Sequence, residues 1–271
     1  MSGVFFRLNH TFTSGFNIDR DPVLSPGSLL LLEPARDNSD NLLSLENYAN
    51  GRAVDLGISG AERAEIVSGL QEFGLLERTG SGAIHGIVTE GALAAGRQAS
   101  VRNLPVLQYI ESNRDHEFAV MATVRMTRNA SVYGTSNISE RECVLVGSAS
   151  PQMVIFQSRT TGNLGAMPYP HETRTGFRSE QIGPANLAGI SAFSPSGSVS
   201  QGRVAIWGGR SYSPDGGYPS YILYRLYIED LTVSGRTFEE VADIESSIAK
   251  ARFSEGGLYF NDTFTDPSTI P

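Results

Sequence analysis

The fold of this 271-residue chain is most readily predicted from the stretch Tyr218-Pro-Ser-Tyr-Ile-Leu-Tyr-Arg-Leu-Tyr-Ile-Glu-Asp-Leu-Thr-Val-Ser-Gly-Arg-Thr-Phe-Glu-Glu-Val-Ala-Asp243. Its first half is typical of a β-strand, in which alternate side chains point to opposite faces. The strand is expected to place Ile222, Tyr224, Leu226 and Ile228 on one face and Tyr221, Leu223, Arg225, Tyr227 and Glu229 on the other. After the Ser234-Gly235 turn, Thr237 and Glu240 match the capping box that begins a helix. The stretch therefore predicts a sheet protein that ends in a short helix.

Further strands are predicted along the chain. Alternation of apolar and polar residues over 115–127 indicates a long strand in an antiparallel sheet with one wet side. Shorter strands are predicted at 4–12, 83–89, 143–146, 153–157 and 203–207, and residues 28–33 contain a short, fully apolar run bounded by prolines. One more helix is predicted over 59–73, because Ser59 and Glu62 match a capping box and apolar residues from Ile66 to Phe73 recur at helical spacing. Residues 160–200 are rich in Gly, Ser, Pro and Asn, and long loops are expected there.

These patterns favour an all-β fold. The 29 glycines and 13 prolines indicate many turns, and a parallel α/β fold would need more than two helices. We therefore predict an antiparallel β-sandwich of the jelly-roll kind with one or two short helices. Residues 1–104 are expected to form an N-terminal segment that adds strands to the sandwich or serves as an assembly arm. Residues 105–271 are expected to form the sandwich and its helical cap.

Composition narrows the possible partners. The net charge of −8 disfavours binding to nucleic acid or to an anionic membrane, because a polyanion would be repelled. The single cysteine, Cys143, excludes an internal disulfide and is expected to be a buried thiol. The first residues lack the pattern of a signal peptide, and no apolar run is long enough to span a bilayer. We therefore expect a soluble protein made in the cytoplasm.

Motifs of common enzymes are absent from the sequence, including the nucleophile elbow, the Walker A loop and the zinc-protease helix. The four histidines, His10, His85, His116 and His171, lack metal-ligand spacing. Paired carboxylates of the glycosidase kind are not evident either, because Glu239 and Glu240 suit the first turn of a helix. These observations favour a protein without catalytic residues.

Calcium is the one metal that the sequence leaves open. Residues 17–21 and 37–41 carry clustered Asn and Asp side chains in predicted loops, and oxygen ligands of this kind bind calcium. Asx-rich turns without a metal are the commoner arrangement. No cofactor is therefore predicted.

A glycine-rich loop offers the best candidate for a ligand site. Flat rings beside charged hydrogen-bonding groups are what sugar recognition requires. The loop after residue 206 carries such groups, namely Trp207, Arg210, Tyr212, Asp215 and Tyr218. The competing interpretation, which carries more weight, is a long hairpin loop whose rings pack on the sheet or on a neighbouring subunit.

The C-terminal part of the chain resembles laminin-G-like, concanavalin A-like jelly-roll domains of tailed-bacteriophage and prophage structural proteins. Two segments carry the resemblance, Tyr224-Arg-Leu-Tyr-Ile-Glu-Asp-Leu-Thr-Val-Ser-Gly-Arg-Thr-Phe-Glu-Glu-Val241 and Gly256-Gly-Leu-Tyr-Phe-Asn-Asp-Thr263. The strand at 117–127 is similar to another strand of these domains, with Thr123 where they usually have tryptophan. The resemblance covers residues 221–267 well, 105–217 loosely and the first hundred residues poorly.

The resemblance implies a non-enzymatic virion protein, a tail-fibre or tail-tip component. Such proteins assemble with themselves, often as trimers, and with other virion proteins, and some bind bacterial surface polysaccharide. The matching segments contain no catalytic residue. Two alternatives stay open: a carbohydrate-binding module or glycan-active enzyme on the same sandwich, and a head-decoration or collar protein.

Overall fold

The computed structural model describes residues 21–37, 39, 41–70, 74–89, 91–92, 95, 97, 99–128, 175–184, 203–207 and 220–270, together with the strand segments 139–145, 153–159 and 166–167. The strand predicted at 4–12 lies outside these residues. So do residues 17–20, which belong to the first loop considered for calcium.

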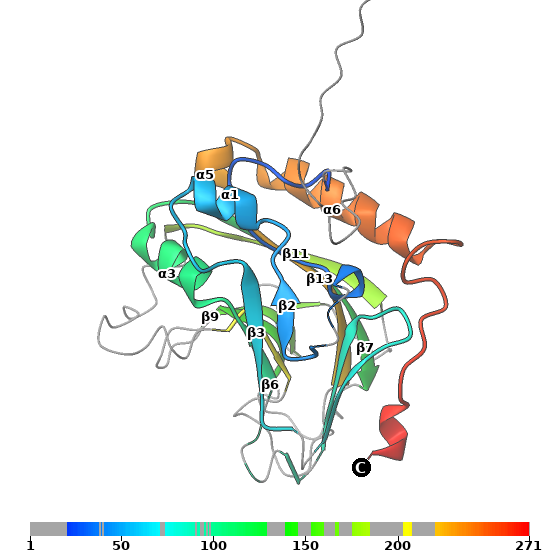
Figure 1. The fold of residues 1–271 in the computed structure, drawn as a ribbon. Helices are drawn as coiled ribbons and strands as arrows, with labels where there is room; N and C mark the ends of the chain where they lie inside the picture. Colours follow the sequence, from blue (N-terminus) through cyan, green and yellow to red (C-terminus); the bar gives the residue numbers. More distant parts are fainter. Residues whose placement is uncertain are drawn as a thin grey trace, which may run out of the picture.

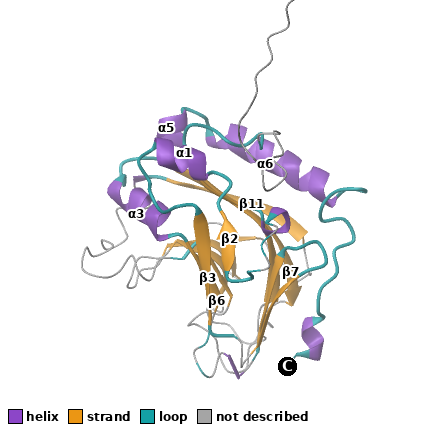
Figure 2. Ribbon diagram, in the orientation of Figure 1, coloured by secondary structure: helices purple, strands orange, loops and turns teal. Residues whose placement is uncertain are grey.

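The described residues form mainly antiparallel β-structure with a few helices, which confirms the sequence prediction at that level (Figure 2). The largest sheet has six strands, namely β1 (Ser28–Leu32), β4 (Gly74–Arg78), β5 (Ile84–Val88), β7 (Phe118–Arg128), β11 (Thr175–Ile182) and β13 (Ser220–Asp230). A second sheet has four strands, namely β2 (Ser44–Glu46), β3 (Arg63–Ser68), β6 (Ala99–Arg102) and β12 (Ala205–Trp207). A third sheet contains β8 (Ser139–Leu145), β9 (Met153–Arg159) and β10 (Ala166–Met167), of which β9 and β10 are parallel.

The helices are short except at the C-terminal end. They are α1 (Asn50–Asp55), α3 (Leu104–Ser112), α5 (Leu231–Ser234) and α6 (Phe238–Phe253), with the 3-10 turns η1 (Pro34–Arg36) and η3 (Pro267–Thr269). The predicted capping box begins α6: the Thr237 hydroxyl accepts from the Glu240 amide, and the Glu240 carboxylate accepts from the Thr237 amide. Within the described residues, none of the helices combines the length and the apolarity that crossing a membrane requires.

Strand β13 is the centre of the six-stranded sheet. Strand β7 pairs along one of its edges, while β5 and β1 share the other edge. Strands from both sides of residue 104 therefore lie in one sheet. A bulge interrupts β13 at Tyr224. Leu223 pairs with Val124 and Arg225 pairs with Thr123, so a step of two residues in β13 matches a step of one residue in β7.

Because of the bulge, the side chains of β13 are distributed over its two faces differently from the prediction. An extra residue in one strand shifts the alternation of side chains by one position. Tyr221 and Leu223 therefore share the main core with Leu226 and Ile228, whereas Tyr227 packs on the opposite face. The sequence predicted uninterrupted alternation, which placed Leu226 and Ile228 opposite Leu223.

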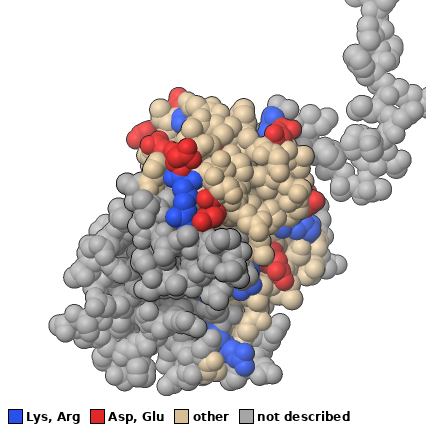
Figure 3. Space-filling view, turned by 90° about the vertical axis from the view of Figure 1, so that its left-hand side faces the viewer, with Lys and Arg blue, Asp and Glu red and all other residues tan. Residues whose placement is uncertain are grey.

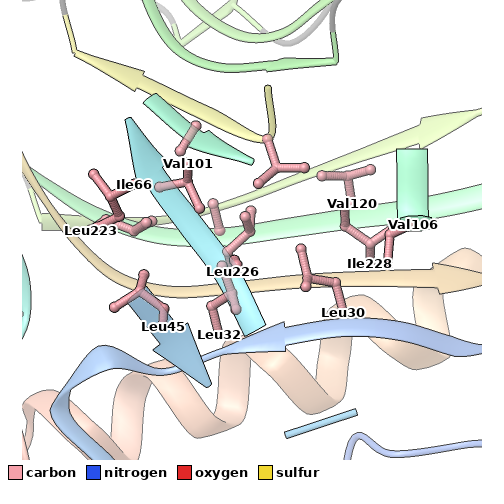
Figure 4. Packing of buried hydrophobic residues seen from close by; sticks show 14 of the residues in the cluster. Leu30, Leu32, Leu45, Ile66, Val101, Val106, Val120, Leu223, Leu226 and Ile228 are labelled. Carbon is pink, nitrogen blue, oxygen red and sulfur yellow. The ribbon is translucent and has the colours of Figure 1, made fainter. Parts of the chain in front are cut away.

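The main core lies between the six-stranded and four-stranded sheets (Figure 4). Leu223, Leu226 and Ile228 of β13 pack in the same cluster as Ile66 of β3 and Val101 of β6. The opposite face of the large sheet is covered by α6, which runs across it in Figure 1. From α6 the chain continues into residues 254–270, drawn in red, which descend beside the large sheet. Of the three described sheets, the largest thus packs on the four-stranded sheet on one face and on a C-terminal layer on the other.

One predicted helix is wrong. Residues 63–68 form strand β3, which pairs with β2 on one side and β6 on the other. Its buried residues Ala64 and Ile66 alternate with exposed Arg63 and Glu65, so the burial has a period of two. Pairing on both edges outweighs the local helix signal at Ser59 and Glu62.

Candidate functional site

The first residue of the predicted sugar loop, Trp207, is a core residue. It lies in β12, is 1% exposed, and stacks on Tyr221 with ring centroids 5.0 Å apart. Its indole Nε1 donates to the Tyr221 carbonyl over 2.9 Å. A buried indole has no free face for a sugar, so the ligand role predicted for Trp207 is corrected, and Trp207 follows the alternative in which the rings pack on the sheet. Arg210, Tyr212, Asp215 and Tyr218 lie outside the described residues, and their role stays a prediction.

The most extensive polar cluster lies on the face of β13 that α6 covers. Arg225 is 1% exposed, and all five of its N–H donors are used. Its guanidinium binds Asp21 and Glu245 with two nitrogens each, and Glu33 with one, at distances of 2.8–3.1 Å. Arg225 therefore ties β13 to α6 and to the segments on both sides of β1.

Charge is balanced inside this cluster. Asp21, Glu33 and Glu245 are all buried, and two further cations reach them. Arg36 contacts Asp21 and Glu33, and Arg252 lies 3.1 Å from Glu33. Three carboxylates thus face three guanidinium groups in a low-dielectric environment, where unpaired charge would be costly.

The carboxylates around Arg225 have opposite pKa shifts. Burial alone would raise the pKa of Asp21, but hydrogen bonds and charge from Arg225 lower it below its ordinary value. Burial raises the pKa of Glu245, and the opposing effect of Arg225 does not cancel it because Asp21 and Glu33 lie close by. Asp21 is therefore held as an ion, and Glu245 takes up a proton more easily than Asp21 does.

A second cluster closes the end of β13. Glu229 is buried and accepts from Tyr227, Ser25 and Arg236. The Tyr227 hydroxyl also lies 2.6 Å from the Ser28 hydroxyl. Arg236 belongs to the Ser-Gly-Arg turn between α5 and α6, so this cluster fixes the turn onto the sheet.

Asp230, His116 and Tyr109 form a third group. The fully buried Asp230 carboxylate accepts from His116 Nδ1 at 2.6 Å and from the Tyr109 hydroxyl at 3.0 Å. Its other oxygen accepts from the Val233 amide and caps α5. Within the described residues Nε2 of His116 makes no hydrogen bond, and the side chain is 23% exposed. The geometry orients an imidazole as a base or ligand would need, yet no described nucleophile contacts it.

A fourth group links the β4–β5 hairpin to the C-terminal residues. Fully buried His85 contacts Glu77 through Nδ1 and Thr127 through Nε2, each at 2.8 Å. The Glu77 carboxylate also accepts the amide and hydroxyl of Thr265. Burial lowers the pKa of His85, which favours the neutral ring. Because a carboxylate only accepts, the neutral ring donates through Nδ1 and accepts the Thr127 hydroxyl at Nε2.

The sequence did not point to this group, although it carried one signal for it. A strand is predicted at 83–89, and the hairpin that β5 forms there with β4 places Glu77 opposite His85. The other clusters had no such signal. Arg225 meets Asp21 and Glu33 across 204 and 192 residues, and no local pattern encodes contacts that distant.

Metal ligands are not brought together among the described residues. No group of three or more His, Cys, Asp or Glu side chains has metal-binding geometry there. Of the loops considered for calcium, Asp21 is engaged by Arg225 and Asp37 by Arg63. Both carboxylates already have cationic partners.

None of the protein-family models, curated proteins and solved structures with which the chain was compared matches it. The function is therefore inferred from the residues and their geometry.

Proposed function

We propose that the protein is a non-enzymatic structural component of a tailed-bacteriophage particle, a tail-fibre or tail-tip protein. In this proposal it is built on a concanavalin A-like jelly roll, assembles with copies of itself and contacts glycans on the host surface.

The observation that carries the proposal is the role of the residues behind the family resemblance. Arg225 and Arg236 anchor buried carboxylates, and Thr237 and Glu240 cap α6. Asp262 accepts from the Ser81 amide and the Tyr224 hydroxyl. Residues that close a fold rather than line a reactive site support a structural protein.

Surface charge supports a protein or glycan partner. On the face drawn in Figure 3, basic side chains lie beside acidic ones and do not gather into one large basic area. With a net charge of −8, such a surface would repel the phosphates of nucleic acid.

Light scattering after size-exclusion chromatography tests the assembly. At micromolar concentration we expect the mass of a homo-oligomer, with a trimer favoured over other states. A mass of 29.2 kDa, that of one chain, at every concentration would contradict self-assembly.

Binding to bacterial surface polysaccharide tests the glycan contact. We expect Tyr212→Ala or Tyr218→Ala to abolish binding on a glycan array, while Val54→Ala on exposed α1 leaves it unchanged. Trp207→Ala is unsuitable because it removes a core side chain. Saccharide turnover that one carboxylate substitution abolishes would favour the glycan-active enzyme instead.

A further inference from the structure

The C-terminal segment of residues 256–270, here named the strap, is drawn in red in Figure 1. It docks on the body of the protein through a row of separate contacts. The Tyr259 hydroxyl donates to Glu33 over 2.6 Å. The Gly80 amide donates to the Thr263 carbonyl over 2.7 Å. Arg128 donates to the carbonyls of Pro267 and Ile270. The body therefore recognises the strap along its whole length.

The groups that receive the strap are held in place by the body itself. Glu77, which accepts from Thr265, is fixed by His85 of the neighbouring strand. Glu33, which accepts from Tyr259, is fixed by Arg225 and Arg36. Each of these receptor side chains therefore has a partner in the body as well as in the strap.

Most residues of the strap are exposed or only partly buried. Among its residues only Tyr259 and Pro267 are buried. Its ring contacts include those of Tyr259 with Tyr224 and of partly buried Phe264 with His85 and Arg125, and its other described contacts are mostly hydrogen bonds. A segment that buries little apolar surface separates from the body at a lower cost in free energy than a core strand does.

A turn at two glycines sets the direction of the strap after α6. Gly256 has φ +77°, and a Cβ on Gly257 would lie 2.4 Å from the carbonyl oxygens of Ala251 and Arg252. The Tyr259 amide then donates back to Arg252 over 2.8 Å. Docking within one chain depends on this tight reversal, so the turn is the hinge about which the strap would swing.

We propose that, in the assembled protein, the strap of each copy docks on the body of a second copy. The inference rests on the self-assembly proposed above and names its interface. Outside the hinge, the strap contacts made within one chain can be made between two chains, so exchange loses little contact energy and is a low-cost route to an oligomer.

Two side chains on the strap favour a second copy as its receptor. Leu258 is 36% exposed and Phe260 is 44% exposed, on either side of buried Tyr259. In a single chain they remain in water next to the hinge. At a junction between two copies they would gain an apolar contact.

Disulfide trapping tests the exchange. A Cβ built on Gly80, whose φ is not positive, lies 3.5 Å from the Thr263 Cβ, within the range of a disulfide. Two chains, Gly80→Cys and Thr263→Cys, are made in a Cys143→Ser background that removes the only native thiol. They are mixed in denaturant, refolded together and oxidised. We expect a covalent dimer joined through positions 80 and 263, identified by peptide mass spectrometry.

The control pair combines Thr263→Cys with Val54→Cys, a position that is 55% exposed on α1, and should give no dimer above background. A chain carrying both Gly80→Cys and Thr263→Cys reports docking within one copy. If it closes only on itself while light scattering shows an oligomer, strap exchange is overturned and self-assembly stands. If light scattering shows only monomers, both proposals fall.

Substitution in the hinge gives an independent readout. Gly257→Ala should disfavour the tight reversal within one chain and raise the oligomeric fraction at a given concentration. Gly51→Ala in α1, where a Cβ would meet nothing within 4 Å, should leave that fraction unchanged. A lower oligomeric fraction for Gly257→Ala would count against the exchange.

Discussion

Arg225 shows how much of this molecule depends on a single buried cation. Its guanidinium satisfies carboxylates from two segments before residue 104 and from α6. Removing one partner of a buried ion pair leaves uncompensated charge, which typically costs about 3–5 kcal/mol. The planar group also makes two bidentate contacts that a lysine could not reproduce.

We expect Arg225→Met to lower the free energy of unfolding by about 3–5 kcal/mol, because Asp21, Glu33 and Glu245 lose a shared partner. Denaturant titration followed by circular dichroism measures this change. The matched control is Arg52→Met, which removes the exposed Arg52–Asp55 pair and should cost less than about 1 kcal/mol. Equal effects for the two variants would mean that the buried cluster contributes no more than a surface pair.

His85 gives the protein a specific dependence on pH. Its pKa is lowered in the folded state by burial, so the unfolded chain binds the proton more tightly. The stability that depends on neutral His85 is therefore complete above the unfolded pKa of about 6.5 and is lost as pH falls toward the folded pKa. Burial would raise the pKa of Glu77, but hydrogen bonds from His85 and Thr265 outweigh it and lower the pKa. The stability that depends on ionised Glu77 is therefore also lost, at a lower pH.

We expect the free energy of unfolding to fall as the pH drops below about 6.5, and to fall less steeply in His85→Asn than in the native chain. One proton corresponds to a slope of at most about 1.4 kcal/mol per pH unit. The two proteins share the other three histidines, so the difference in slope isolates His85. Parallel curves would show that His85 does not titrate in this range.

At the scale of the element, β5 and β12 approach so closely that only glycine fits between them. A Cβ at Gly86 would lie 2.4 Å from Cδ1 of Trp207. We expect Gly86→Ala to lower the free energy of unfolding by about 1–3 kcal/mol, because the indole ring or the strand must move. Trp207 is the only tryptophan, so its fluorescence reports the shift directly. Gly51→Ala is the control, because a Cβ at this position in α1 meets nothing within 4 Å, and it should not lower the free energy of unfolding. If Gly86→Ala also left the free energy of unfolding unchanged, β12 would be able to move away from β5 without cost.

The elements that sequence predicted well are those whose signals are local. The α6 helix begins where its capping box places it, and β7 covers most of the strand predicted at 115–127. The wet side predicted for that strand is wrong, because β7 is buried on both faces from Phe118 to Val124. The helix predicted at 59–73 is wrong because β3 is stabilised by pairing with β2 and β6. Neither of these two strands is predicted from the sequence, so the pairing could not be taken into account. Helix α3 was missed although Asn103 caps it and Pro105 lies in its first turn.

The candidate site was less predictable than the elements. The bulge near Tyr224 reverses the faces of half of β13 and turns Arg225 toward α6 with Tyr227 and Glu229. A bulge is set by pairing with β7 and leaves no clear mark in the sequence of β13 itself. The glycine-rich context of Trp207 is visible in the sequence and left two interpretations open, a sugar platform and, with more weight, packing on the sheet. Its stacking on Tyr221 agrees with the second, and no local pattern encodes that contact.

At the scale of the whole molecule, long-range pairing joins the two halves of the chain. Strands β1 and β5 precede residue 104, yet both hydrogen-bond to β13 near the other end. Two of the three carboxylates around Arg225, Asp21 and Glu33, also come from the first half. A fragment that begins at residue 105 would lack one side of its central strand and most of the charge that Arg225 needs.

We therefore expect the full chain to unfold in one cooperative transition, with far-ultraviolet circular dichroism and Trp207 fluorescence changing together in guanidinium chloride. The fragment 105–271 contains β13 without β1 and β5, and we expect it to show no cooperative transition. Adding the fragment 1–104 during refolding is the matched rescue and should restore the transition if pairing across residue 104 is what holds the fold. A fragment 105–271 that unfolds cooperatively by itself, at the midpoint of the full chain, would show instead that the C-terminal part is an independent domain and that β1 and β5 are additions to its edge.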